Sequence, residues 1–87
     1  MVQIIEKSGE SFEEAIVILD ASNHLEGVNA EYQYLAKRFG AQGKDWRLLT
    51  QRLIPHGGRQ YDKIEIELAD QTKKTIFFDI TSFFGKF

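Results

Sequence analysis

The chain has 87 residues, of which 11 are basic and 13 acidic, for a formal net charge of −2, and 43% of its side chains are hydrophobic. This length suits a single domain with one core, and the nearly balanced charge provides no general attraction to phosphate backbones or anionic membranes. Because the sequence contains no cysteine, disulfides, thiolate catalysis and cysteine-ligated metal sites are excluded.

The N-terminal segment, residues 1–10, lacks the basic region and the apolar stretch of a signal peptide. The longest apolar run, residues 15–19, is far shorter than the roughly 20 residues of a membrane span. We therefore expect a cytoplasmic protein that makes no membrane contact. Residues 1–10 are assigned to no element and are interpreted as a segment that can be flexible.

Residues 11–20 allow two interpretations. Ser11 and Glu14 have the spacing of a capping box, which favours a helix. Three consecutive β-branched residues, Ile16 to Ile18, instead favour a strand that is buried on both faces. We predict a strand over residues 14–20.

An amphipathic helix is predicted over residues 26–39. Its apolar side chains recur at helical spacing, acidic residues lie early and basic residues late, and Gly40 follows as a C-terminal cap. The predicted core stripe consists of Val28, Tyr32, Leu35 and Phe39.

Three strands are predicted after the helix. Residues 46–54 carry apolar side chains at both parities, so neither face of that strand is expected to be fully exposed. Gly57 and Gly58 are interpreted as a hairpin turn that needs a positive φ. The next two strands alternate regularly, with Ile64, Ile66 and Leu68 inward on one and Ile76, Phe78 and Ile80 inward on the other.

The register of the last hairpin follows from parity, because opposed residues share one face of the sheet. A three-residue loop over residues 70–72 pairs Ile66 with Ile76 on the inside. The same register opposes Lys63 to Asp79 on the outside and leaves Phe77 facing outward.

The predicted fold class is therefore α+β. One amphipathic helix packs on a mainly antiparallel sheet, in the two-layer order β-α-β-β-β, and the sheet ends in a three-strand meander. Residues 1–87 form a single domain, and residues 81–87 form a short aromatic tail in which Ser82 caps a turn and Gly85 ends it.

The aromatic residues outside the predicted core indicate an interaction surface. One helix covers one face of the sheet, so the outer face is expected to remain open and apolar. The tail rings, which include Phe87, either fold over this face or pack against another chain. The predicted surface consists of Tyr61, Phe77, Phe83 and Phe84.

Several polar residues suggest chemistry only weakly. His24, Glu26 and Glu31 cluster near the helix start, but Glu26 and Glu31 lie about 140° apart around a helix and do not share a face. Two histidines without cysteine make a metal site improbable, and no metal or cofactor is predicted. An alternative polar pocket between helix and sheet draws on His24, Tyr32, Arg52 and Asp79.

The leading hypothesis is a small, non-catalytic interaction module, either a homodimer or an accessory subunit that binds another protein. The alternative is a small enzyme or ligand-binding protein that uses the polar pocket. Single-stranded nucleic-acid binding by the arginines and aromatic residues is a weaker hypothesis, because neighbouring glutamates such as Glu67 are expected to neutralise these arginines.

Overall fold

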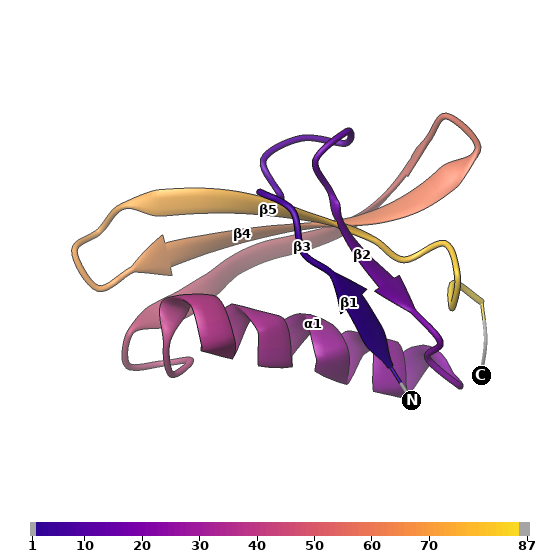
Figure 1. Cartoon of the computed structure of the whole chain (residues 1–87). Coiled ribbons are helices and arrows are strands. Elements are labelled where there is room, and N and C mark those ends of the chain that lie inside the picture. Colours follow the sequence, from indigo (N-terminus) through magenta and orange to yellow (C-terminus); the bar gives the residue numbers. More distant parts are fainter. Residues whose placement is uncertain (1, 86–87) are drawn as a thin grey trace.

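The computed structural model describes residues 2–85 and contains six elements: β1 (Gln3–Ile5), β2 (Ile16–Leu19), α1 (His24–Phe39), β3 (Trp46–His56), β4 (Arg59–Leu68) and β5 (Lys73–Asp79). The strands form one sheet in the order β1-β2-β5-β4-β3, in which β2 and β5 are parallel and the other neighbours antiparallel. Helix α1 lies across one face of the sheet (Figure 1). The predicted α+β class and the β3-β4-β5 meander are confirmed.

The N-terminal half contains one strand more than predicted. β1 pairs with β2 and opposes Ile4 to Ile18, so the element order is β-β-α-β-β-β. The strand interpretation of the following segment is confirmed, because Ile16 and Ile18 are both fully buried in β2. The expected burial on both faces is found on one only, because Val17 and Leu19, which point to the opposite face, are half-buried.

Helix α1 begins two residues earlier than predicted. The side chain of Asn23 accepts a hydrogen bond from the backbone N–H of Glu26 at 2.9 Å and acts as the N-cap. At the other end Gly40 has a φ of 105° and donates its N–H to the carbonyl of Ala36. The glycine cap was therefore predicted correctly.

The predicted core stripe of α1 is rotated from the observed one. Leu35 is fully buried as expected, but Val28, Tyr32 and Phe39 are only half-buried. The predicted stripe follows apolar side chains at helical spacing, whereas small residues such as Gly27 and Ala30 allow the backbone of the helix to approach the sheet. The buried residues of the helix are Gly27, Ala30, Glu31, Tyr34 and Leu35.

Gly27 makes this rotation possible because the ring of Phe83 lies directly against it. A Cβ atom at position 27 would stand 2.5 Å from two ring carbons of Phe83. Phe83 itself is completely buried on the helix side of the sheet. The aromatic tail thus turns under the sheet beside α1, and it does not cover the outer face.

The hairpin between β4 and β5 has the predicted parity in a different register. Ile64 pairs with Ile76 and Lys63 with Phe77, which shifts each β4 residue by two positions along β5. The loop has three residues, as predicted, but it comprises residues 69–71, with Gln71 at a φ of 71°. A left-handed third residue is the usual geometry of such loops. The observed register has this loop geometry in place of the predicted pairing of Ile66 with Ile76.

A β-bulge at Leu49 explains the mixed pattern of β3. Leu48 pairs with Ile66 and Thr50 with Glu65, so Leu49 is the extra residue between them. Beyond the bulge, the residues that face the helix are those of odd number, including Leu53. At the far end of β3, Gly57 and Gly58 form the predicted tight turn, both with a positive φ.

The outer face of the sheet is covered where Phe77 lies. Phe12, in the segment between β1 and β2, places its ring 4.8 Å from that of Phe77 and 5.0 Å from that of Tyr61, centroid to centroid. It also stacks on His56 at 4.0 Å. A loop that the sequence analysis left without a role therefore supplies the ring that covers Phe77.

We predict that the two adjacent tail phenylalanines differ sharply in their contribution to stability. Replacing Phe83 by Ala should lower the free energy of unfolding by about 3–5 kcal/mol, because it empties a fully buried site. Replacing Phe84, which is 44% exposed, should cost less than about 1 kcal/mol. Urea denaturation of both variants measures the difference, and equal losses would contradict this placement of the tail.

Candidate functional site

Two acidic residues meet in the layer between α1 and the sheet. Glu31 comes from the buried face of α1 and is completely inaccessible, and Asp62 comes from β4 and is 2% exposed. Asp62 shares the inward parity of Ile64, so it lies on the core face of its strand. Burial of two carboxyl groups is costly unless they are paired or protonated.

The neighbourhood of Glu31 favours its protonated form. Burial raises the pKa of this carboxyl to about 11, and Asp62 adds to the shift as hydrogen-bond partner and as a negative charge. Neither oxygen of Glu31 accepts a hydrogen bond from a donor within residues 2–85. The contact between the two carboxyl groups becomes a hydrogen bond only when Glu31 carries a proton, and its raised pKa keeps that proton in place at neutral pH.

A short chain of hydrogen bonds connects Asp62, through Gln51 of β3, to Tyr32 of α1. The hydroxyl of Tyr32 donates to Oε1 of Gln51 at 2.7 Å, and Nε2 of Gln51 donates to Oδ2 of Asp62 at 2.6 Å. Burial raises the pKa of Tyr32, and the nearby charges of Glu31 and Asp62 raise it further. Gln51 is thereby held with its amide nitrogen toward the acids.

A small pocket of about 130 Å³ opens beside the acid pair. His24, in the first turn of α1, reaches it and packs edge to face on Phe83, with ring centroids 6.0 Å apart. Leu53 of β3 is 55% exposed, so the pocket meets the surface at that strand. The pocket is lined by His24, Val28, Glu31, Gln51, Leu53, Asp62 and Ile80.

Only part of the predicted polar pocket is brought together. His24 lines the observed pocket, and Tyr32 reaches it through Gln51. Arg52 and Asp79 belong to the outer face. In the strand register Arg52 lies opposite Lys63 of β4, and Asp79 lies opposite Tyr61. Glu26 and Glu31 do lie on different sides of α1, as expected, but Glu31 is a buried core residue and not a solvated charge near the helix start.

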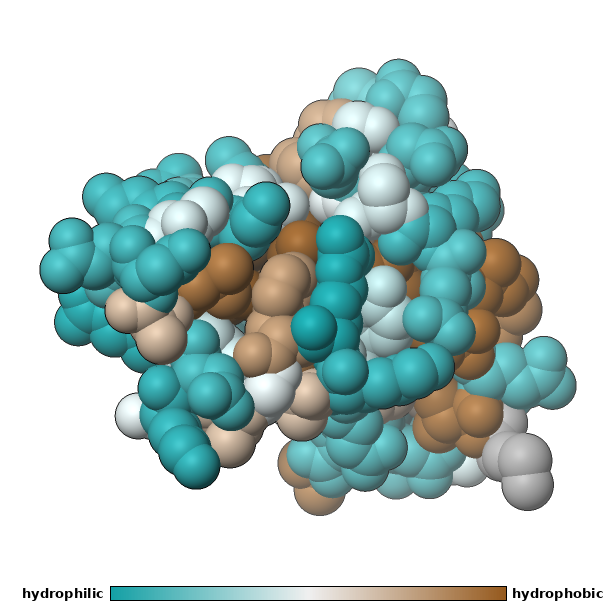
Figure 2. Space-filling view, turned by 60° about the vertical axis from the view of Figure 1, so that its left-hand side comes forward, coloured by the Kyte–Doolittle hydropathy of each residue, from teal (hydrophilic) through white to brown (hydrophobic). Residues whose placement is uncertain are grey.

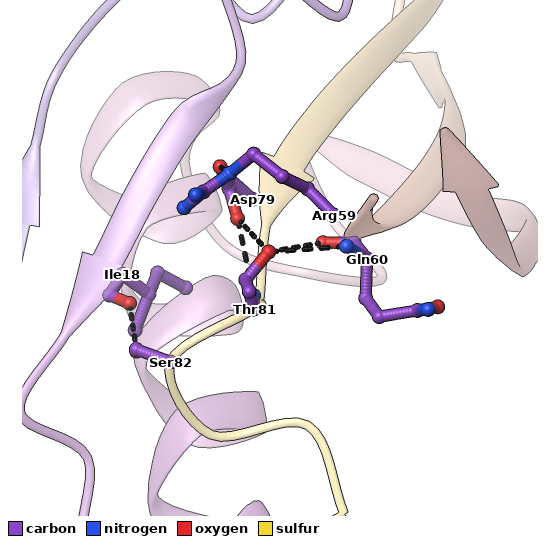
Figure 3. A network of polar contacts seen from close by, with 6 residues as sticks. All are labelled: Ile18, Arg59, Gln60, Asp79, Thr81 and Ser82. Carbon is purple, nitrogen blue, oxygen red and sulfur yellow. Dashed lines mark hydrogen bonds and ion pairs between the residues drawn. The ribbon is translucent and has the colours of Figure 1, made fainter. Parts of the chain in front are cut away.

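Asp79 makes a different ion pair from the predicted one with Lys63. The shift in register brings it to Arg59, whose Nε lies 2.6 Å from Oδ2, and its other oxygen accepts from the hydroxyl and backbone N–H of Thr81 (Figure 3). Burial alone would raise the pKa of Asp79, but the hydrogen bonds and charge from Arg59 and Thr81 outweigh it and lower that pKa. This carboxylate is fully satisfied.

Ser82 also departs from its predicted role as a cap. Its hydroxyl donates to the carbonyl of Ile18 at 2.6 Å and joins the start of the tail to β2 (Figure 3). Thr81, one residue earlier, accepts a hydrogen bond from the backbone N–H of Gln60. Together these contacts direct the chain after β5 toward the helix side.

The four residues predicted to form an interaction surface lie in separate places. Tyr61 is 7% exposed beneath Phe12, Phe77 is half-buried beside it, and Phe83 is in the core. Phe84 is exposed, and Phe87 lies outside the described residues. On the face shown in Figure 2, hydrophobic side chains reach the surface in patches divided by polar ones. Association through these residues stays a prediction.

Asp62 and Gln51 are the site residues that the sequence analysis missed. Asp62 precedes Ile64 by two positions in a clearly alternating strand, so its inward orientation could have been read from the sequence. Gln51 faces inward only because the bulge at Leu49 reverses the parity of β3, and a bulge has no reliable signal in a single sequence.

Other kinds of site find little support in the described residues. Within residues 2–85, no three His, Asp or Glu side chains are grouped so that they could hold a metal ion. The helix found in the same part of the chain is not long and apolar enough to cross a membrane. Two of the arginines are paired with acids, Arg47 with Glu67 and Arg59 with Asp79.

Comparison with protein-family models, with curated proteins and with solved structures found no match to this chain.

We predict that Glu31 makes the protein less stable as the pH rises. Between its unfolded pKa of 4.5 and its folded value of about 11, the folded state keeps a proton that the unfolded chain releases. The free energy of unfolding should fall by up to about 1.4 kcal/mol per pH unit in this range. Urea denaturation at several pH values between 5 and 9 measures the slope.

The Glu31→Gln variant should lose this slope, because glutamine does not titrate. Glu26→Gln is the matched control on the same helix. The side chain of Glu26 accepts a hydrogen bond from the backbone N–H of Ser22 near the surface, and this variant should keep the slope. An unchanged slope in Glu31→Gln would show that another group carries the pH dependence.

Proposed function

We propose that this chain is a non-catalytic interaction module that forms a homodimer by pairing the edge strand β1 with β1 of a second copy. The observation that carries the proposal is a groove of about 390 Å³ between β1 and α1, directly beside the free edge of β1. Addition of a strand to a free sheet edge is a common mode of protein recognition. The cytoplasmic location predicted from the sequence is part of this proposal.

The two edges of the sheet differ in how they are protected. The long edge strand β3 carries the bulge at Leu49, Pro55 near its end, and the charges of Arg47 and Arg52. Bulges, proline and charged side chains are the devices by which natural edge strands avoid pairing with other chains. Strand β3 is therefore poorly suited to receive another strand.

Within Gln3–Ile5, β1 has no bulge, proline or charged side chain, and its short length of three residues is its one feature of this protective kind. Val2 and Ile4 are half-buried and line the groove, and Leu25 of α1, which is 69% exposed, lines it from the other side. An added strand would cover Ile4 and the side chain of Leu25 together. A recess of mixed apolar and polar lining beside a free strand edge is suited to receive an added strand.

A second copy suits this edge. Antiparallel pairing about Ile4 on a two-fold axis opposes Gln3 to Ile5 and Val2 to Glu6, so like charges are not brought together. The groove continues past Ile4 to Lys37 at the end opposite Glu26. A two-fold axis reverses the direction of the partner, so the Glu26 end of one groove approaches the Lys37 end of the other, where Lys37 is paired with Glu6 at 3.1 Å.

Association would also help so small a chain. A domain of this size buries only about 60% of the surface that its unfolded chain exposes, and small chains commonly gain stability by oligomerising. If the partner is instead another protein, the chain is an accessory subunit that uses the same edge. A mass measurement on the isolated chain distinguishes these two forms of the hypothesis.

We predict that light scattering will give twice the mass of one chain at protein concentrations from micromolar to millimolar. Leu25→Gln should weaken the dimer about tenfold or more, because it removes an apolar anchor from the groove. Leu53→Gln is the matched control, since it changes a similarly exposed leucine at the β3 edge. A wild type that stays monomeric throughout, or a dimer weakened only by Leu53→Gln, would overturn the proposed homodimer.

A further inference from the structure

We propose that the pocket between α1 and the sheet is a binding site for the ammonium group of a primary alkylamine, with Glu31 and Asp62 as its two acidic partners. The site is on the helix side of the sheet at β3, and it does not depend on pairing through β1. It gives the alternative hypothesis of a small-ligand-binding protein a specific chemical class of ligand.

The two acids that line the pocket carry buried acceptors without donors. Three buried carboxyl oxygens accept no hydrogen bond from the described residues: Oε1 and Oε2 of Glu31 and Oδ1 of Asp62. The fourth oxygen, Oδ2 of Asp62, already accepts from Gln51. Buried acceptors are rarely left without a donor, and both acids are more than nine-tenths buried.

The number and charge of the donors favour ammonium. A primary ammonium group has three N–H donors and no acceptor, which matches the three oxygens that need donors once both acids are ionised. A proton on Glu31 can join the two carboxyl groups but supplies only one donor. A neutral hydroxyl also supplies only one, and it adds lone pairs that face other acceptors. Charge-assisted bonds between ammonium and carboxylate are the stronger class of hydrogen bond.

The size and the walls of the pocket fit a short alkyl stem. Its volume of about 130 Å³ equals that of roughly four water molecules, which suits an ammonium group with a few methylene groups. Val28, Leu53 and Ile80 supply apolar walls. An alkylammonium with its charged end at the acids would extend past Val28 and Leu53 toward the surface.

Binding should depend on pH through Glu31. The titratable side chains that face it are Asp62 from β4 and His24 and Tyr32 from α1, and the polar side chain from β3 is the uncharged Gln51. Because burial raises the pKa of Glu31 to about 11, a bound ammonium must displace its proton at neutral pH. The affinity should therefore increase up to tenfold per pH unit while the amine itself remains protonated.

The direct test is a titration of the ¹⁵N-labelled protein with n-butylammonium chloride, followed by amide chemical shifts, at several pH values from 7 to 9. We expect saturable shifts centred on Glu31, Gln51 and Asp62, and an affinity that increases with pH. The neutral analogue n-butanol, at equal concentration, should give no saturable shift at these residues. Saturable shifts of equal size with butanol, or none with butylammonium, would overturn the proposal.

Variants locate the site. Glu31→Gln and Asp62→Asn should each weaken butylammonium binding at least tenfold, whereas Glu26→Gln, on the same helix, should leave it unchanged. His24→Gln should retain the increase of affinity with pH if Glu31 is the group that loses the proton. Equal binding by Glu31→Gln and the wild type would contradict the site. Thermal unfolding of each variant confirms that it is folded before the comparison is made.

A second readout does not depend on any variant. Calorimetry at pH 7.5 in two buffers with different ionisation enthalpies should show about one proton released per butylammonium bound, and no proton release would exclude the displacement of the Glu31 proton. Nα-acetyl-lysine methylamide distinguishes the sources of the amine. Binding of this compound indicates a lysine side chain of a partner, and binding of butylammonium alone indicates a free small amine.

Discussion

The contact between Gly27 and the ring of Phe83 is the constraint on which most of the helix layer depends. The ring occupies the space that any side chain at position 27 would need, so helix and tail approach each other closely only at glycine. This contact selects which face of α1 is directed to the sheet. That face includes Glu31, while Val28 and Tyr32 are turned toward β3. The acid pair is thus a consequence of how the tail packs.

The regular elements were predictable because their patterns are local. Alternation identified β4 and β5, the β-branched run identified β2, and the glycine cap marked the end of α1. The parity of the last hairpin was also deducible, since a slip by one residue would move every inward side chain to the other face. A slip by two residues preserves parity, so the hydrophobic pattern could not distinguish the predicted register from the observed one.

The remaining features depend on contacts between segments far apart in the sequence. Phe12 covers Phe77 and Tyr61 only because the loop before β2 folds back over the sheet. Arg59 meets Asp79 only in the observed register, and Gln51 faces Asp62 only after the bulge. For the candidate site, the sequence singled out His24 and Tyr32 and noted Glu31, but it offered no reason to place Glu31 opposite Asp62. The rotation of α1 about its own axis places Glu31 opposite Asp62, and small residues such as Gly27 are weak sequence signals of how a helix is rotated.

The buried carboxyl groups on the two faces of the sheet differ in how their oxygens are satisfied. Asp79 is buried on the outer face, yet Arg59 and Thr81 satisfy both of its oxygens and lower its pKa. Asp79 and Arg59 therefore form a structural ion pair. Among residues 2–85, Gln51 is the only donor to Glu31 and Asp62, and the pKa of Glu31 is raised. Replacing buried charges by well-packed apolar residues of similar volume often leaves a protein at least as stable. Leu or Met at position 31 would continue the buried face of α1 and would leave no acceptor without a donor at that position. Two acids held at the wall of a pocket that reaches the surface lower the stability of the free chain, and a cation with several N–H donors is the class of ligand that would reverse this cost on binding.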